Sequence, residues 1–401
     1  MGKYSIMLVF ALVVMLGVIL PNVHSLGNRS VENFLNYSMQ IQSHNLAVSG
    51  ANAAATQIYL TPEWREGYSE VSVNGGRYNV SVTDYDTNKI RILSVGGLED
   101  SRDTVLVILQ GTSFSRYAYY SKVEGAITWI TGDTVWGPFH TQDQMKISGT
   151  PVFKGKASAK NGTNPDPSLA IFEGGFVKGV SIDLPLNLDP TEQGAIDGGR
   201  VFATGDLWLN FVNNNVEWKT AVGDPPTVTA LSDFTANGTI MLNAGNIHVQ
   251  GVLDGRVTLL AKQGGVSSAG NIYIDDDIRY THDPRTGASS NILGLIAEND
   301  VIITDNAANN SSVTIQAAIF CHKGGLTAQN HNSRPVAGKI NLLGGLVQYQ
   351  RRPVGIFSSV GGIPTITSGF LKNYRYDDRF YIDAPPFYPW TGGYQVVTWM
   401  E

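Results

Sequence analysis

The 401-residue chain has little cysteine and little charge. Its single cysteine, Cys321, excludes an internal disulfide framework, and because it ends the apolar run 317–321 it is expected to be a buried small side chain rather than a nucleophile. Charged residues make up 15% of the sequence, and the net charge of −6 is spread along it, so no basic patch supports nucleic-acid binding. The chain is instead rich in glycine, with 44 residues. This composition is typical of a β-rich extracytoplasmic protein.

Near the N-terminus, an uncharged apolar run extends from Ile6 to Leu20 behind Lys3. It is at the short end of the length that crosses a membrane, about 20 residues. Two interpretations fit this segment. Either Val23-His24-Ser25 marks signal-peptidase cleavage and the protein is secreted, or the run is retained as an anchor with its N-terminus inside.

The segment behind this run keeps an approximately helical spacing of apolar residues from Ser30 to Leu60. Ser30 is a candidate N-cap, and Pro62 is expected to end the helix. A helix of about 30 residues would be roughly 45 Å long. Such a helix directly behind an apolar segment favours retention of residues 1–25 and resembles the spine of a pilin-like subunit. An amphipathic helix packed on the next domain is the alternative interpretation.

Alternating apolar residues then predict a small β region. Tyr78–Val82 and Lys89–Leu93 are expected to be two strands joined by the turn 83–88. The turn carries a D-x-D-x-N motif from Asp84 but lacks the Gly and the late Glu of an EF-hand loop, so a polar hairpin is favoured over a calcium site. The apolar run Thr104–Leu109 predicts a central strand.

An aromatic-rich link follows this β region. Dense aromatic residues can stack on sugars or bases, but no basic residues alternate with these, so packing in the core and between domains is favoured. The aromatic residues are Phe114, Tyr117, Tyr119, Tyr120, Trp129 and Trp136.

From about Gly198 onward, β-prone runs of three to five residues alternate with turns rich in Gly, Asn and Asp. This pattern is typical of a parallel β-helix, in which short strands stack rung on rung around an apolar interior. A β-sandwich would have longer strands at more regular spacing. The predicted strands are Ile240–Leu242, Ile247–Val249, Val257–Leu260, Ile272–Ile274, Leu293–Ala297, Val301–Ile303, Val313–Ile315 and Ile340–Leu343.

The predicted fold is therefore mainly β with a long N-terminal α-helix and a parallel β-helix-like C-terminal body. Five segments are expected. They are the hydrophobic N-terminal helix at 1–62, a small β or α+β region with the hairpin at 63–135, an aromatic and Gly/Pro-rich connecting region at 136–200, the β-helix-like domain at 201–358 and a C-terminal cap at 359–401.

The acidic run Asp275–Asp277 is the first candidate for catalysis or ion binding. If rungs stack, Asp300 and Asp305 could join it, with the cationic pair Arg351–Arg352, as in β-helix enzymes that act on polysaccharides. However, consecutive side chains of a strand point to opposite faces, so three in a row cannot converge on one ligand. A solvated turn with incidental ion binding is favoured.

Two other groups of residues are candidates for a functional site. His140 and His248 are outside any zinc-binding spacing, and His140 is expected to hydrogen-bond a backbone carbonyl. A polar-aromatic group near the C-terminus is expected to be a structural clamp in which Asp377 pairs with Arg379. This group comprises Tyr374, Tyr376, Asp377 and Arg379. No catalytic, cofactor-binding or metal-binding residue is predicted, and the protein is not expected to be an enzyme.

Several motifs beyond Trp136 occur in a consistent order. They are Trp136–Asp143 followed by Ile147–Phe153, then Gly251–Thr258, Leu293–Val301, Arg352–Phe357, Gly369–Asp377 with Arg379, and Pro385–Pro389. Together they resemble bacterial pilus-assembly-like surface proteins, in which a pilin-like N-terminal region of the PilX type precedes a large domain of the DUF4900 type. The resemblance covers most of the chain beyond Trp136 and, more weakly, the N-terminus. The prepilin site differs, since Lys3 follows Gly2 where Phe is usual, and Met7 stands where Glu is expected.

The sequence and the resemblance together predict a non-enzymatic structural protein of a bacterial envelope. Its N-terminal helix is expected to bundle with other copies, or with pilus or secretion-system subunits, and to be anchored in the inner membrane. The β-rich body is expected outside the cytoplasm, at the cell surface or on an extracellular filament. The alternative is a secreted β-helix protein that binds or degrades polysaccharide. No cofactor and no nucleic-acid partner are expected.

Overall fold

The computed structural model describes residues 2–86, 88–185, 187–360 and 363–401. The contacts within the chain divide it into two units. Unit 1 comprises the residues up to Thr112 together with Gly392–Glu401, and unit 2 comprises Ser113–Thr391. The boundaries expected from the sequence, at residues 62, 135, 200 and 358, each lie inside one of these units.

Unit 1 begins with a single uninterrupted helix, α1, which spans Gly2–Leu60. Its 59 residues make it about 90 Å long, roughly twice the predicted length. Pro21 lies within the helix. Ser30 is not an N-cap, so that prediction is wrong: its hydroxyl lies mid-helix and donates a 2.9 Å bond to the carbonyl of Leu26. The helix ends two residues before Pro62, as predicted.

The rest of unit 1 is an antiparallel sheet in the order β1-β2-β3-β4-β30. The predicted hairpin is present as β2 and β3, but its turn is tighter than expected because the strands extend to Asp86 and Lys89. The predicted apolar strand lies inside β4, which is flanked on both sides and is therefore central. The strands are β1 (Tyr68–Val73), β2 (Gly76–Asp86), β3 (Lys89–Leu98), β4 (Ser101–Ser113) and β30 (Trp390–Met400).

Unit 2 is built on a 22-stranded sheet in which most pairings are parallel, with a small three-stranded sheet beside it. All eight strands predicted from the sequence are present, although six of them are longer than the expected three to five residues, the longest being β27 with 15 residues. The strands before residue 180 are β5 (Tyr119–Val123), β6 (Trp129–Ile130), β7 (Thr134–Trp136), β8 (Phe139–Thr141), β9 (Met145–Ser148), β10 (Val152–Phe153), β11 (Ala157–Ala159), β12 (Thr163–Asn164), β13 (Ile171–Phe172) and β14 (Phe176–Lys178).

The later strands carry the longer ladders. They are β15 (Arg200–Phe202), β16 (Leu207–Asn213), β17 (Asn215–Lys219), β18 (Thr227–Ala230), β19 (Thr239–Leu242), β20 (Ile247–Leu253), β21 (Arg256–Ala261), β22 (Ile272–Tyr280), β23 (Ile292–Ala297), β24 (Val301–Ile303), β25 (Val313–Cys321), β26 (Leu326–Ala328), β27 (Val336–Gln350), β28 (Gly355–Val360) and β29 (Ile363–Tyr376). Short helices are α2 (Asp189–Gly198), α3 (Leu231–Phe234), η1 (Phe114–Arg116), η2 (Ala308–Asn310) and η3 (Asp378–Tyr381).

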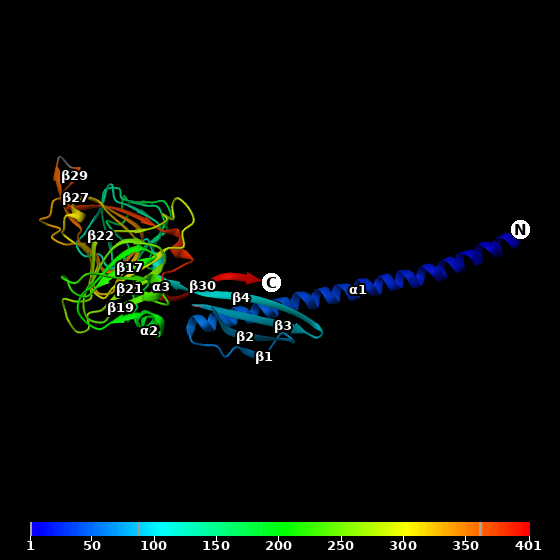
Figure 1. The fold of residues 1–401 in the computed structure, drawn as a ribbon. Coiled ribbons are helices and arrows are strands. Elements are labelled where there is room, and N and C mark those ends of the chain that lie inside the picture. Colours follow the sequence, from blue (N-terminus) through cyan, green and yellow to red (C-terminus); the bar gives the residue numbers. More distant parts are fainter. Residues whose placement is uncertain (1, 87, 186, 361–362) are drawn as a thin grey trace. The chain divides into compact units, whose positions relative to one another are not determined.

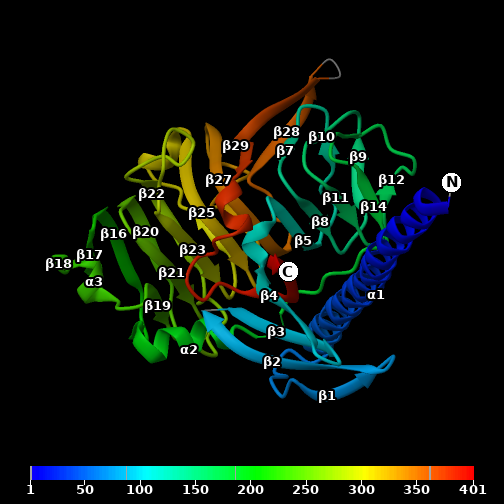
Figure 2. The ribbon, with the colours of Figure 1, turned by 90° about the vertical axis from the view of Figure 1, so that its right-hand side faces the viewer.

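Parallel pairing stacks these strands in register, and Figure 2 shows β19, β21, β23, β25 and β27 side by side. The register places apolar side chains directly above one another, so that each strand extends the same buried column. One column consists of Ile240, Leu259, Leu295, Ile319 and Leu346, all of them buried. A stack of this kind buries a continuous core that no single strand could form alone.

The aromatic-rich link belongs to the same stack. β5 pairs in parallel with β27, and β8 pairs with β5, so the column continues from Leu346 to Tyr119 and Phe139. Of the six predicted packing aromatics, Phe114, Tyr119, Tyr120 and Trp129 are buried in the core of unit 2, Tyr117 is partly buried against it, and Trp136 is exposed. The structure thus confirms a mainly β fold with a long N-terminal helix and a parallel-rich sheet.

Candidate functional site

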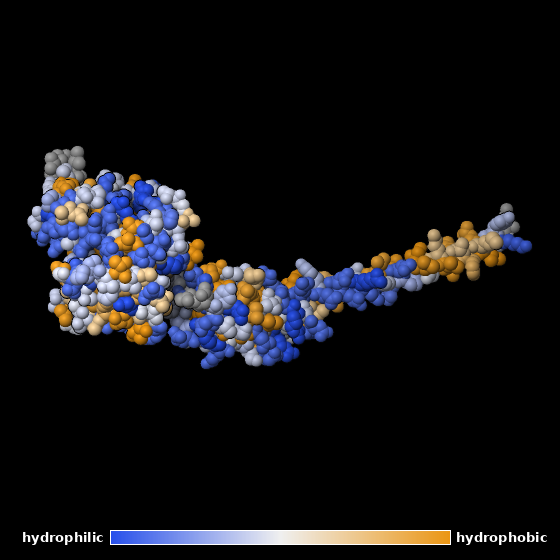
Figure 3. All heavy atoms as spheres, in the orientation of Figure 1, coloured by the Kyte–Doolittle hydropathy of each residue, from blue (hydrophilic) through white to orange (hydrophobic). Residues whose placement is uncertain are grey.

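The first part of α1 is the most exposed apolar surface of unit 1. Figure 1 shows it running free of strands β1–β4, and Figure 3 shows apolar residues gathered at its N-terminal end with a polar stretch behind them. The helix contains an 18-residue window of mean hydropathy 2.7, no part of which is buried. By length and composition, this segment is able to cross a membrane.

The last part of α1 packs on the sheet of unit 1 through small residues. Its buried face has the three- and four-residue spacing of one side of a helix and consists of Ser43, Leu46, Ala47, Gly50, Ala51, Ala54 and Ile58. The helix lies close enough to β3 that a Cβ on Gly96 would be 2.2 Å from the carbonyl oxygen of Ser43. A Cβ on Gly50 would likewise be 2.5 Å from the hydroxyl of Ser94. Small side chains therefore hold helix and sheet at short range.

A polar contact fixes the helix at the same place. His44 Nδ1 lies 2.9 Å from a carboxylate oxygen of Asp103 on β4, and its Nε2 lies 3.6 Å from the side-chain carboxylate of Glu401. The Ser43 hydroxyl donates to the carbonyl of Ser101 at 3.2 Å. The start of the packed segment is thus tied to both β4 and the residue that follows β30.

The acidic residues proposed as a site in unit 2 do not form one. Asp275 bonds His248 and Thr304, whereas Asp276 is exposed and Asp277 pairs with Arg279. The pairing of β22 with β20 is irregular between Ile274 and Ile278, so the three aspartates do not follow the regular alternation of a strand. Among the described residues, no three His, Cys, Asp or Glu side chains are grouped closely enough to hold a metal ion.

The other members of the proposed site also have separate partners. Asp300 accepts from the Arg352 guanidinium at 3.0 Å and from the backbone N–H of Gly325 at 2.8 Å. Asp305 accepts from the Asn330 amide at 2.8 Å. These contacts join the turns of neighbouring strands. The D-x-D-x-N turn of unit 1 behaves similarly, because Asp84 accepts a 2.9 Å bond from Arg65.

The two candidate histidines have different surroundings. His140 is buried, and its Nδ1 lies 2.8 Å from the Ser158 hydroxyl rather than from a backbone carbonyl, so the predicted partner is wrong. Burial lowers the pKa of His140 to about 4, since the charged imidazolium loses its hydration, although a bond to Gln142 partly opposes this. His248 is half-buried and contacts a carboxylate oxygen of Asp275 at 2.9 Å. They are not close enough together with other ligands to hold a metal.

The C-terminal polar-aromatic group is a clamp, as predicted. The Arg379 guanidinium donates to both carboxylate oxygens of Asp377 and, at 2.6 Å, to the carbonyl of Ser289. Asp377 also accepts from the backbone N–H of Arg379 at the start of η3. Tyr374 and Tyr376 are buried in the core of unit 2. Cys321 is completely buried in β25, and burial raises the pKa of its thiol, as expected for a core side chain.

The structure contains one buried charged cluster that the sequence did not indicate. Glu124 has no exposed side-chain surface, and it accepts from Arg351 at 2.9 Å, from the Trp129 indole at 2.9 Å and from the Tyr119 hydroxyl at 3.1 Å. The Arg351 guanidinium also lies 3.9 Å from the centre of the Trp129 ring. Glu124 and Arg351 are 227 residues apart, so no local pattern connects them. The only feature of the sequence that pointed to this cluster was a single acidic residue, Glu124, within the aromatic-rich segment.

This cluster is better suited to stability than to chemistry. Burial, together with the nearby Arg351, lowers the pKa of Lys372 to about 8, a shift that could suit a catalytic amine. However, the cavity that Lys372 and Arg351 line has a volume of about 10 Å³. That is room for about one water and for no substrate.

The comparisons with known proteins found little similarity. No protein-family model and no curated protein matches the chain. Among solved structures, the chain is similar to the competence-associated pilin ComZ from Thermus thermophilus, with 13% identity, a TM-score of 0.35, and coverage of 90% of this chain and 97% of that chain. A similarity this weak does not establish a shared fold or family. The resemblance to PilX-type and DUF4900-type proteins therefore stays a prediction.

Proposed function

We propose that the protein is a non-enzymatic, pilin-like structural subunit of a bacterial envelope. In this proposal, α1 anchors it in the inner membrane and bundles with helices of other copies or of pilus or secretion-system subunits. The β-rich body, whose stacked strands we infer to form a parallel β-helix, is then presented outside the cytoplasm. The observation that carries the proposal is a continuous helix with one fully exposed apolar segment and one packed segment.

The exposed segment is costly to leave in water. Each fully buried side chain of Leu, Ile, Val, Phe or Met size is worth about 1.5–3 kcal/mol, and the run Ile6–Leu20 contains many of them. An 18-residue helix is about 27 Å long, close to the hydrocarbon thickness of a bilayer, about 30 Å. Lys3 precedes the run, and Arg29 is the next positive residue after it. A membrane or a bundle of similar helices would remove this surface from water.

A second apolar surface supports contact with partner helices. Between the apolar run and the packed segment, Val31, Phe34, Leu35 and Ile41 are all exposed. At 100° per residue, these side chains share one side of α1, and that side is nearly opposite the face that packs on the sheet. One face of the helix thus serves its own unit, while the other is left for another helix.

Single-cysteine cross-linking tests this proposal. The native Cys321 is buried, so Phe34→Cys places one reactive thiol on the free apolar face of α1, and Glu32→Cys is the matched control on the other side. In membranes, mild oxidation is expected to link Phe34→Cys to a neighbouring subunit and to leave Glu32→Cys largely monomeric. The native protein is expected to sediment with membranes or filaments. A freely soluble protein whose first residue is Leu26 would overturn the proposal.

A further inference from the structure

A cavity of about 260 Å³ lies in unit 2 along four neighbouring strands of one sheet, in the order β17, β16, β20 and β22. Its walls include Trp208, Asn210, Glu217, His248, Gln250 and Asp275. The parallel register explains why these residues meet, since Trp208 lies beside His248 and Asn210 lies beside Gln250. The antiparallel hairpin then brings Glu217 opposite Asn210.

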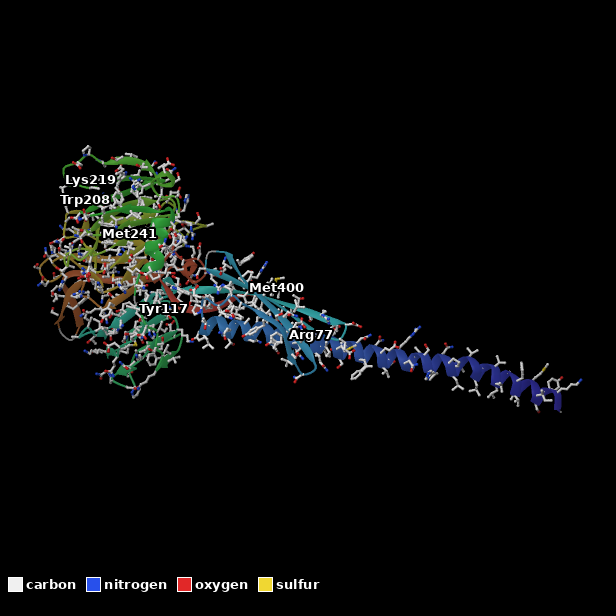
Figure 4. All side chains as sticks on the ribbon, turned by 90° about the horizontal axis from the view of Figure 1, so that it is seen from below. Arg77, Tyr117, Trp208, Lys219, Met241 and Met400 are labelled. Carbon is white, nitrogen blue, oxygen red and sulfur yellow. The ribbon has the colours of Figure 1, made fainter. Side chains whose placement is uncertain are left out.

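Aromatic rings form one side of this cavity. His248 is stacked between Trp208 and Tyr273, with ring centres 5.0 and 4.8 Å away and planes within 16° and 9° of parallel. The opposite residue in the hairpin, Lys219, places its ammonium 5.9 Å from the Trp208 ring, and Figure 4 labels these two side chains near each other. The faces of the imidazole are therefore covered, and its ring edge is what remains for a ligand.

Some polar groups of the cavity are hydrogen-bonded within the protein, and others can bond a ligand. Glu217 accepts from the Asn210 amide at 2.8 Å with one carboxylate oxygen, Oε2. The contact between His248 Nδ1 and Asp275 requires the proton on Nδ1, because a carboxylate only accepts, so neutral His248 keeps Nε2 as an acceptor. The Gln250 amide makes no hydrogen bond to any described residue. Acceptors are thus combined with one amide that can both donate and accept.

This combination selects among ligand classes. Glu217 and Asp275 disfavour an anion, and the Lys219 ammonium already donates to the carbonyl of Val222 at 3.0 Å. An apolar ligand would leave the carboxylates and amides unpaired. Three closely grouped metal ligands are not found among the described residues. A ligand rich in hydroxyl groups meets each requirement, because every hydroxyl donates to an acceptor and accepts from an amide.

We propose that this cavity binds one neutral sugar unit of a glycan, held by hydrogen bonds to Glu217, His248 and Gln250. The body of the protein would then have a binding function in addition to its assembly through α1. The site does not depend on that assembly, because all of its residues belong to unit 2.

Calorimetric titration of the full-length protein in detergent tests the inference. The probes are neutral oligomers of glucose and of N-acetylglucosamine, with galacturonate oligomers as the anionic comparison. Gln250→Ala and Glu217→Gln each change a cavity group with little loss of packing, and Gln193→Ala on α2 is the matched control, since its amide is exposed and bonds Asp197. At least one neutral oligomer is expected to bind, with affinity reduced tenfold or more by each cavity variant and unchanged by Gln193→Ala.

Three results would overturn this assignment. The first is the absence of binding by every neutral oligomer at millimolar concentration. The second is tighter binding of the galacturonate oligomers. The third is binding that Gln250→Ala and Glu217→Gln leave unchanged. Circular dichroism of each variant shows whether the fold is retained, and Glu217→Gln keeps the shape of the side chain if Gln250→Ala does not fold.

Discussion

The two units use the same kinds of side chain for opposite purposes. In unit 2, residues such as Ile240, Leu259 and Leu295 are completely buried and lie in register on neighbouring parallel strands. In unit 1, Leu8 and Phe10 on α1 remain 65% and 70% exposed. The stacked unit therefore buries its apolar residues within the chain, whereas the helical unit leaves many of them exposed.

The units also differ in how their elements are held together. In unit 1, the helix and the sheet pack closely because Gly50 and Gly96 have no side chain, which allows α1 to lie directly on β3. Unit 2, besides its apolar stack, contains a buried set of large and charged side chains in which Glu124 contacts Arg351 and Trp129. A substitution that disrupts one of these two sets of contacts should therefore destabilise its own unit and leave the other unit folded.

The largest expected effect concerns the exposed helix. The double substitution Val13→Arg and Leu16→Arg places two charges in the apolar run, and each costs about 2.5–3.5 kcal/mol at the centre of a membrane span. Membrane association should weaken by about 5–7 kcal/mol, so the protein should move from the pellet to the supernatant on sedimentation. Val13→Leu with Leu16→Ile is the control and should stay in the pellet. If the double arginine variant sediments normally, this segment is not the anchor.

The next effect should be confined to unit 2. Arg351→Met leaves Glu124 buried without its cation, and breaking a buried pair in this way costs about 3–5 kcal/mol. The neighbouring Arg352→Met removes a partly exposed pair with Asp300 and should cost at most about 1 kcal/mol. Urea unfolding followed by tryptophan fluorescence measures the difference. Equal losses for the two variants would show that burial of the Glu124 pair does not matter.

The sequence was sufficient where one pattern is repeated over neighbouring residues. The apolar runs after Gly198 all lie in strands, because alternating or continuous apolar residues determine which side chains face the core. The buried face of α1 was not readable from the apolar spacing, because Val31, Phe34 and Leu35 belong to the same pattern but are exposed. The start of the helix could not be predicted. Ser30 has the side chain of an N-cap, but its hydroxyl bonds the carbonyl of Leu26, within a helix that has already begun.

The features of the fold that could not be predicted depend on contacts between residues that are far apart in the chain. Strands of two or three residues, such as Val152–Phe153, carry too little periodicity to be recognised. The pairing of β5 with β27 joins segments separated by more than 200 residues, and the same is true of Glu124 and Arg351. The cavity beside Trp208 likewise depends on the register of one hairpin and two further strands, which composition does not reveal.

A smaller effect is expected from the close packing of unit 1. In Gly96→Ala, the new methyl group would meet the backbone of Ser43 and Ala47 on α1, so helix and sheet must separate. Overpacking of this kind typically costs about 1–3 kcal/mol. Gly27→Ala is the control, because a Cβ there meets nothing within 4 Å and alanine favours the helix. Hydrogen exchange should show faster exchange in residues 43–58 for Gly96→Ala alone, and unchanged exchange there would contradict the close approach.

The effect that is smallest near neutral pH is a pH dependence that should be limited to unit 2. Burial lowers the pKa of His140 to about 4 in the folded protein, whereas an unfolded chain has a histidine pKa of about 6.5. Above pH 6.5 neither state binds the proton, so stability is unaffected. As pH falls from 6.5 to 4, only the unfolded state binds it, and stability should fall by up to about 3 kcal/mol. His140→Phe keeps a ring beside Tyr120 but cannot titrate, so its unfolding free energy should vary less over this range. An identical pH profile for the variant and the native protein would mean that His140 is hydrated in the folded state, and that the interior of the stack near β8 is open to water.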